Sequence, residues 1–158
     1  MILAKRAIEP LDLVPFEDAL VPKEILPALE AFTVPRKPSY ALVAGIDGIH
    51  LLHRDPARLI DPADAARPVP GGRSGATLGA EADPPCHVIV DRGRIAGLWE
   101  FDPDAGKIVH QSFVPEDKAL REAIAETEAF IRDELGDARS FSLDSPKSRA
   151  PRLAALRA

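Results

Sequence analysis

Two carboxylates, Glu100 and Asp102, stand two positions apart in the stretch GLWEFDP. On a β-strand this spacing places both side chains on one face, roughly 7 Å apart, which suits an acid and base pair in a hydrolase. Asp102 also begins the stretch DPDAG, and aspartate is common at the first position of a β-turn. The sequence therefore leaves two interpretations of Asp102 open, and the turn explains the residue without any catalysis.

The histidines and the single cysteine form no familiar metal-binding pattern. His50 and His53 are three residues apart, so on a strand they point to opposite faces. His87 and His110 belong to separate predicted strands, which allows them to approach one another. Because Cys86 is the only cysteine, an internal disulfide and a cysteine-based zinc site are excluded. We expect neither a metal nor a cofactor.

Basic residues gather in two places where they could contact phosphate groups. Arg92 and Arg94 flank the tip of a predicted hairpin, although arginines at such a turn can also be merely solvated. The tail, residues 139–158, has five cations against Asp144, a balance of +4, and we expect it to lie outside the core. It suits contact with a DNA backbone or, alternatively, with an acidic surface of its own protein. The candidate DNA contacts are Arg92, Arg94, Lys147, Arg149, Arg152 and Arg157.

An antiparallel meander over residues 86–113 is expected to position most of these candidates. Its strands are predicted at 86–91, 94–101 and 107–113. The first turn is Arg92-Gly93 and the second is DPDAG. The only tryptophan, Trp99, lies in the middle strand, where we expect it to point into the core.

Residues 115–135 give the clearest helix signal. Pro115 suits the first helical position, and Gly136 suits a left-handed C-cap. Seven carboxylates against three cations give a balance of −4, so this helix would repel phosphates and is interpreted as structural. Its apolar stripe, which is expected to pack on the sheet, contains Leu120, Ile124, Thr127, Ile131 and Leu135.

Three further segments complete the predicted fold. Residues 1–39 contain six of the sixteen prolines and predict an irregular segment with a short helix. Residues 40–54 surround Asp47-Gly48, a strong hairpin signal. Residues 56–85 contain six prolines and four glycines, which predict a flexible loop with one helical turn near its start. Within it, GGRSGATLG superficially resembles a phosphate-binding loop but lacks the Gly-Lys-Ser/Thr ending.

These elements predict an α+β fold. The hairpin and the meander would form a small, partly closed barrel, which hides strand edges. One amphipathic helix would cover it, with 1–39 as a Pro-rich N-terminal segment and 40–158 as the main domain.

Length and charge limit the functions. A chain of 158 residues predicts one main domain. Its net charge of −5 argues against a free-standing domain that holds DNA through bulk charge. No apolar run approaches a membrane span, and the N-terminus lacks a signal-peptide core. We therefore expect a soluble, cytoplasmic protein with no membrane partner.

Three stretches resemble a known family. They are PSYALVAGIDGIHLLHRD, HVIVDRGRIAGLWEFDP and IRDELGDARSFSLDSPKSRAPRLAAL. They are similar to the C-terminal part of bacterial winged-helix proteins of the AlkZ-like, crosslink-repair DNA glycosylase family. The resemblance implies tandem winged-helix motifs followed by a C-terminal β-barrel, which together clasp duplex DNA, and excision of alkylated or crosslinked bases.

The catalytic signature of that family is missing. It is a Gln-x-Gln or Gln-x-Asp motif, whereas the only glutamine here is Gln111, followed two positions later by Phe113. No catalytic residue is therefore carried over. The chain resembles the rear portion of such a protein.

Three hypotheses about function follow. The first is a non-catalytic DNA-binding or DNA-repair module, whose partner is duplex DNA, bound weakly and without sequence preference, or an N-terminal winged-helix portion. The second is a protein-interaction or structural module that completes the fold of a partner protein. The third is a small carboxylate-dependent hydrolase that uses Glu100 and Asp102.

Overall fold

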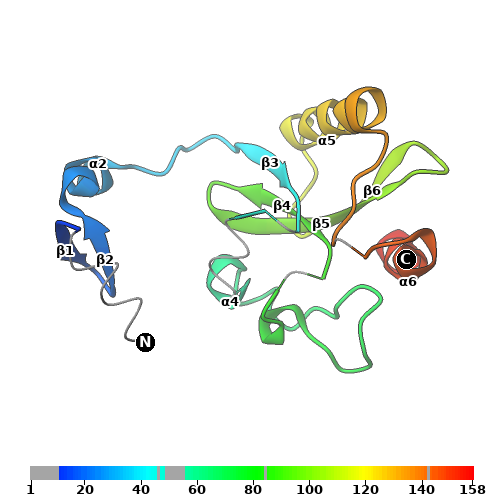
Figure 1. Ribbon diagram of the computed structural model, residues 1–158, viewed down its shortest axis with the longest axis horizontal. Coiled ribbons are helices and arrows are strands. Elements are labelled where there is room, and N and C mark those ends of the chain that lie inside the picture. The colour runs from blue at the N-terminus through cyan, green and yellow to red at the C-terminus, as the bar shows by residue number, and fades with distance from the viewer. Residues whose placement is uncertain (1–10, 46, 49–55, 84, 142) are drawn as a thin grey trace. The chain divides into compact units, whose positions relative to one another are not determined.

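The chain divides into two compact units, Met1–Pro35 and Arg36–Ala158, and each has its own secondary structure (Figure 1). The predicted boundary, after residue 39, falls slightly further along the chain. The second arm of the hairpin predicted at 40–54 lies outside the described residues. The computed structural model describes residues 11–45, 47–48, 56–83, 85–141 and 143–158.

The N-terminal unit contains a small antiparallel hairpin that the sequence did not predict. Its turn includes Glu17, which has a positive φ of 50°. Pro15 and Pro22 lie in its strands, which a two-stranded sheet tolerates because every strand has an open edge. The predicted short helix is present. The elements are β1 (Leu13–Phe16), β2 (Ala19–Pro22), the 3-10 turn η1 (Lys23–Ile25) and α2 (Leu26–Ala31).

The second unit is an α+β structure built on a four-stranded antiparallel sheet in the order β3-β4-β5-β6. The predicted meander is confirmed as β4-β5-β6. Trp99 is 3% exposed, as expected for a core residue, and its Nε1 donates a hydrogen bond to the Val88 carbonyl (3.1 Å). No closed barrel is found in the described part of the chain. The strands are β3 (Tyr40–Val43), β4 (His87–Asp91), β5 (Arg94–Asp102) and β6 (Lys107–Ser112).

The turn between β4 and β5 is a tight two-residue turn. Arg92 has φ 49° and Gly93 has φ 86°. Two successive positive φ angles define the turn type whose twist matches a β-hairpin. Glycine takes this conformation without strain, whereas Arg92 is held in it by the strands on either side.

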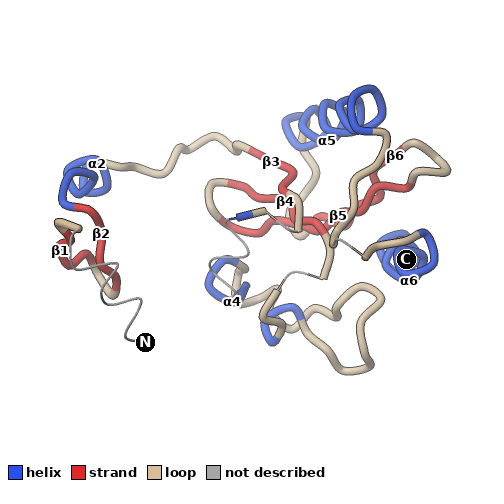
Figure 2. Tube along the Cα trace, viewed as in Figure 1, coloured by secondary structure: helices blue, strands red, loops and turns tan. Residues whose placement is uncertain are grey.

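The sheet lies between two layers, as Figure 2 shows. Helix α5 (Lys118–Phe130) covers one face, where Leu120 packs near Trp99 and Phe101. The opposite face is covered by residues of the 56–80 segment and by Leu156 near the C-terminus. Alternation along β5 explains this division, because Trp99 and Phe101 point to one face and Leu98 to the other.

Helix α5 begins later than predicted. The structure places its start at Lys118 and not at residue 115, because Asp117 is the N-cap and accepts a hydrogen bond from the Leu120 amide (2.8 Å). The predicted C-cap is confirmed, since Gly136 has φ 75°. A π-turn, η3 (Ile131–Leu135), forms the last turn before this glycine, closed by the Gly136 amide on the Ile131 carbonyl (2.7 Å).

The segment predicted as a flexible loop contributes to the core. Its helical turn is present as α4 (Pro56–Leu59), followed by the 3-10 turn η2 (Leu78–Ala80). Ile60 forms a β-bridge with Ile95, and Leu78 is 4% exposed. The sequence did not indicate this packing, because the few large apolar side chains are widely spaced, yet all reach the same face of the sheet.

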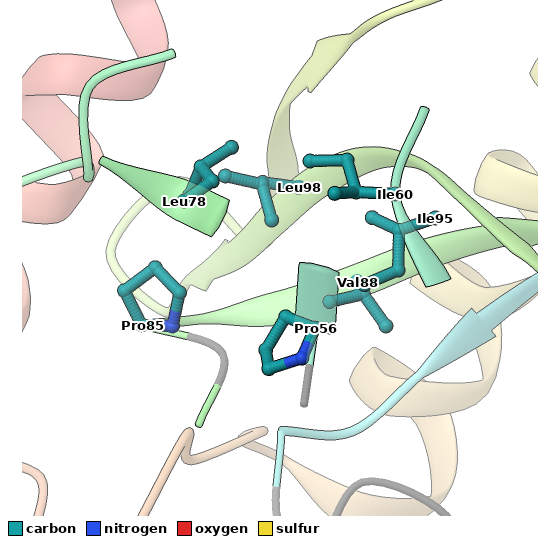
Figure 3. A pocket seen from close by; sticks show the side chains of 7 residues that line it. All are labelled: Pro56, Ile60, Leu78, Pro85, Val88, Ile95 and Leu98. Carbon is teal, nitrogen blue, oxygen red and sulfur yellow. The ribbon is translucent and has the colours of Figure 1, made fainter. Parts of the chain in front are cut away.

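These residues enclose a very small cavity. Its volume is about 10 Å³, and the residues that line it all have apolar side chains (Figure 3). A space of this size holds at most one water molecule, and apolar walls offer that water no hydrogen bond. The cavity is a packing gap in the core. Its lining residues are Pro56, Ile60, Leu78, Pro85, Val88, Ile95 and Leu98.

The expectation that the basic tail lies outside the core was wrong. Residues Pro146–Arg157 form helix α6, and its Leu153 and Leu156 are buried. Ser145 caps the helix through a reciprocal capping box with Ser148. The composition misled because two of the charged residues that suggested an exposed tail, Arg149 and Arg152, are themselves buried. No helix in the described ranges is long and apolar enough to cross a membrane.

Candidate functional site

The buried face between β5 and α6 holds the densest group of charged side chains. Glu100 is fully buried, and Asp144, Arg149 and Arg152 are each less than 10% exposed. Alternation along β5 places Glu100 on the same face as Leu98, toward α6. We call the group formed by Glu100, Asp137, Asp144, Arg149 and Arg152 the α6 ion network.

Arg152 joins two carboxylates from different parts of the chain. Its Nε donates to Glu100 Oε1 (2.5 Å), and its Nη2 donates to Asp144 Oδ2 (2.8 Å). The Ser140 hydroxyl also donates to Glu100 Oε1 (2.6 Å). One guanidinium therefore connects the middle of β5 with the segment that precedes α6. Arg152 also lies over the ring of Phe141, 5.2 Å from its centroid.

Arg149 makes a second set of connections. Its Nη1 donates to the Phe101 carbonyl (2.9 Å) and to Asp137 Oδ1 (2.7 Å). Its Nη2 donates to Asp137 Oδ2 (3.2 Å), which completes a bidentate pair. Its Nε donates to Asp144 Oδ2 (3.4 Å). Arg149 therefore holds the beginning of α6 against β5 and against the chain after Gly136.

The electrostatics of the network follow from burial and from these hydrogen bonds. Burial alone would raise the pKa of Asp144, but hydrogen bonds from Arg152 and Ser148 and the charge of Arg152 outweigh it and lower the pKa to about 2. At Glu100 burial is the larger effect and raises the pKa, although hydrogen bonds from Arg152 and Ser140 lower it in part. Asp144 therefore stays ionised and paired with Arg149 and Arg152 at every ordinary pH.

The carboxylate pair suggested by the sequence is divided between two structural roles. Glu100 is sealed from solvent, so a substrate does not reach it. Asp102 Oδ1 accepts a hydrogen bond from the Asp104 amide (3.0 Å), which confirms the turn interpretation, and Asp102 Oδ2 pairs with Arg157. The geometry therefore does not support a hydrolase that uses Glu100 and Asp102.

The candidate contacts in the tail have unequal surroundings. Arg149 and Arg152 are committed to the network, and the Arg157 side chain is 51% exposed beside Asp102. Lys147 is exposed on α6. The alternative interpretation, a basic tail that contacts acidic groups of its own protein, describes the observed contacts of all three arginines.

The turn between β4 and β5 forms a second, exposed basic site. Arg92 Nη2 lies 2.7 Å from Asp91 Oδ2, and Arg92 Nη1 donates to the backbone carbonyl of Arg36 (3.2 Å). This contact places Arg36 and Lys37 beside the turn that carries Arg94. We call Arg36, Lys37, Arg92 and Arg94 the turn cluster; all four are exposed.

The sequence did not reveal that Arg36 and Lys37 belong to this site, because 56 positions separate Arg36 from Arg92. The signal that could have found them is strand pairing. In the observed register Tyr40 pairs with Asp91, and a prediction that β3 pairs with β4 would have placed the residues before Tyr40 beside the turn.

His87 and His110 have structural partners. The His87 Nδ1 accepts a hydrogen bond from the Gly45 amide (2.9 Å), and its ring stacks on Trp99 with centroids 4.2 Å apart. Burial lowers the pKa of His87 to about 4, so the ring is neutral at pH 7. Strand register places Trp99 between His87 and His110, and His110 Nε2 lies 2.9 Å from Glu116 Oε1.

The remaining candidates offer no metal site in the described part of the chain. No group of three potential ligands gathers there, and His50 and His53 lie outside the described residues. Cys86 is fully buried, and burial raises the pKa of its thiol. In the glycine-rich stretch, a Cβ at Gly71 would lie 3.0 Å from Arg152, so this loop packs against α6.

Comparisons of the chain with protein-family models, with curated proteins and with solved structures find no match. The geometry of the α6 ion network and of the turn cluster therefore carries the functional argument.

Proposed function

We propose that this chain is a non-catalytic module that binds duplex DNA through the phosphate backbone, as its resemblance to the rear portion of AlkZ-like DNA glycosylases suggests. The observation that carries the proposal is the hydrogen bond from Arg92 to the Arg36 carbonyl (3.2 Å). It brings the backbone of residues 36–37 to the β4–β5 turn, so that four exposed cations belong to chain segments that meet near Asp91, in a chain whose net charge is −5.

The turn cluster suits phosphate contact and not base recognition. Arginine and lysine at the tip of a hairpin reach the backbone, and such contacts carry no sequence information. Asp91 neutralises part of the charge of Arg92, which leaves Arg36, Lys37 and Arg94 as the contacts. With about three phosphates neutralised, affinity falls in the non-specific range of roughly 10⁻⁴–10⁻⁶ M.

A winged-helix portion, in the same polypeptide or in a partner protein, would supply sequence recognition and catalysis in this proposal. The partly closed barrel also belongs to the proposal, with β3 and β6 as the sheet edges that further structure would cover. Neither feature is needed for the backbone contacts themselves.

Fluorescence anisotropy of a labelled duplex at two salt concentrations tests the proposal. The test variant replaces Arg36, Lys37 and Arg94 with serine. The matched control replaces three other exposed cations, Arg73, Lys107 and Lys147, and so changes the net charge equally.

We expect the wild type to bind weakly, with a slope of log K against log salt near −2.7, since each neutralised phosphate contributes about −0.9. The test variant should lose most of this slope, whereas the control should keep it. Absence of binding by the wild type at low salt, or equal losses in both variants, would contradict the proposal.

A second candidate function, a protein-interaction module, is favoured by the N-terminal unit. None of its described residues, 11–35, is buried. Leu20, Phe32 and Val34 are each more than 60% exposed. A segment whose described residues expose large apolar side chains and form no buried core is typical of one that packs against another protein.

Affinity capture with the full chain distinguishes this candidate from DNA binding. Proteins retained by the wild type but lost from a Leu20→Ser and Phe32→Ser variant, with unchanged anisotropy on the duplex, would support it. Identical sets of retained proteins would contradict it.

A further inference from the structure

Helix α5 and the π-turn η3 present an exposed surface that the functions above do not use. Phe130, the last residue of α5, is 54% exposed. Leu135, the last residue of η3, was expected in the stripe that packs on the sheet, but it is 57% exposed. A π-turn is closed by a hydrogen bond between residues five apart, so a residue five positions on lies about one turn further along the helix. Phe130 and Leu135 therefore form a small apolar patch at the end of this helix.

Two carboxylates flank the patch. Glu126 lies four residues before Phe130 and Glu134 four residues after it, so both neighbour Phe130 on the helix surface. Both are exposed. We call Glu126, Phe130, Glu134 and Leu135 the α5 acidic surface.

These two carboxylates differ from the others on α5 and η3. Glu122 pairs with Lys118 (3.3 Å), Glu128 with Arg132 (3.8 Å), and Asp133 with Arg132 (3.1 Å). Glu126 and Glu134 have no ion pair among the described residues. The negative charge that the helix leaves uncompensated is therefore concentrated on both sides of Phe130.

From this juxtaposition we infer that the α5 acidic surface binds a cationic amphipathic segment of a partner protein. Lysine or arginine side chains of that segment pair with Glu126 and Glu134, and an apolar side chain packs on Phe130 and Leu135. The charge excludes nucleic acid as the occupant, because phosphates would be repelled. Aromatic side chains are common anchors at the centre of protein interfaces, and charged side chains are more common at the rim that surrounds them.

The inference does not depend on the proposed DNA binding. Its test uses the full chain and a fluorescently labelled helical peptide of lysine and leucine in an amphipathic pattern. A peptide with glutamate in place of every lysine serves as the probe control. Binding is measured by anisotropy at low and at moderate salt.

Two variants probe the two parts of the surface. Phe130→Ser removes the apolar anchor, and the double variant Glu126→Gln with Glu134→Gln removes the charge. Leu143→Ser is the apolar control, since Leu143 is 86% exposed. Glu122→Gln with Asp133→Asn is the charge control, since both of these carboxylates already have partners.

We expect the wild type to bind the lysine peptide and not the glutamate peptide. Each test variant should weaken binding by roughly tenfold or more, and each control by less than threefold. The melting temperature should not change in Phe130→Ser, because the side chain is exposed. Absence of peptide binding, or equal weakening in test and control variants, would overturn the inference.

Sedimentation of the wild type provides a separate check. A dimer that Phe130→Ser dissociates would show that a second copy of this chain occupies the surface, and would also overturn the inference. A monomer that binds the peptide supports it.

Discussion

The turn cluster and helix α6 use the same amino acid in opposite surroundings. Arg94 is exposed at the start of β5, next to a two-residue turn, whereas Arg152 is 7% exposed and donates to two carboxylates. In the sequence the two residues look alike, because Arg94 follows Arg92 by two positions and Arg152 follows Arg149 by three. Basic residues therefore indicate a binding surface only where the fold gives their side chains no internal partners.

The two regions also differ in what their charges contribute to stability. Exposed ion pairs contribute about 0–1 kcal/mol, because water already solvates both partners. A buried pair is costly to form, and removal of one partner leaves an uncompensated charge, which destabilises by about 3–5 kcal/mol. The α6 ion network should therefore dominate the response of the protein to loss of an arginine.

The largest effect is expected for Arg152→Ala. It leaves Glu100 and Asp144 buried without their guanidinium, so the free energy of unfolding should fall by about 3–5 kcal/mol. Denaturant unfolding followed by tryptophan fluorescence measures this, since Trp99 is buried. The matched control Arg94→Ala should change stability by less than about 0.5 kcal/mol. Similar values for the two variants would remove the contrast between the regions.

Acid should weaken the network by a smaller amount. The pKa of Asp144 is lowered from 3.8 to about 2 in the folded protein, so its contribution is present above pH 4 and is lost as the pH falls toward 2. Since one pKa unit corresponds to about 1.4 kcal/mol, the contribution is roughly 2 kcal/mol.

The variant Asp144→Asn isolates that contribution. We expect the wild type to be more stable than the variant at pH 6, and the difference to shrink steadily in unfolding measurements from pH 4 downward. A difference that stays constant with pH would show that Asp144 has an ordinary pKa.

Arg157→Ala should have a smaller effect again. Arg157 pairs with Asp102, but its side chain is 51% exposed. Asp102 is itself mostly buried, but its Oδ1 keeps the hydrogen bonds from the Asp104 and Ala105 amides. We therefore expect a loss of about 1 kcal/mol in denaturant unfolding. A loss as large as that of Arg152→Ala would place Arg157 in the network.

Local patterns predicted much of the fold. The Arg92-Gly93 turn, the meander, the burial of Trp99 and the Gly136 cap all follow from residues close to one another in sequence. The hairpin β1-β2 was not predicted, because its prolines argued against strands. Residues Ile60 and Leu78 were assigned to a flexible loop, because their contacts with the sheet depend on tertiary structure.

The sites were harder to predict than the fold for a related reason. The connections that tie the α6 ion network to β5 join positions that are distant in the chain; 52 residues separate Glu100 from Arg152, and 48 separate Phe101 from Arg149. A single sequence shows the charges and not their partners. The interpretation of Asp102 as a turn residue succeeded because its partner, the Asp104 amide, lies two residues away.

The smallest effects on stability are expected at Arg94 and Lys147, and here the two regions can be compared directly. Both residues are exposed, and neither forms an ion pair within the described residues. Arg94→Ser and Lys147→Ser should therefore each change the free energy of unfolding by less than about 0.5 kcal/mol.

Binding of a duplex should nevertheless distinguish the two variants, because Arg94 belongs to the turn cluster and Lys147 lies on α6, where the neighbouring arginines are neutralised. Arg94→Ser should reduce the steepness of the salt dependence by about 0.9, whereas Lys147→Ser should leave it unchanged. Equal reductions, measured by anisotropy on one duplex, would mean that DNA responds to the total charge of the chain and not to the cluster at the turn.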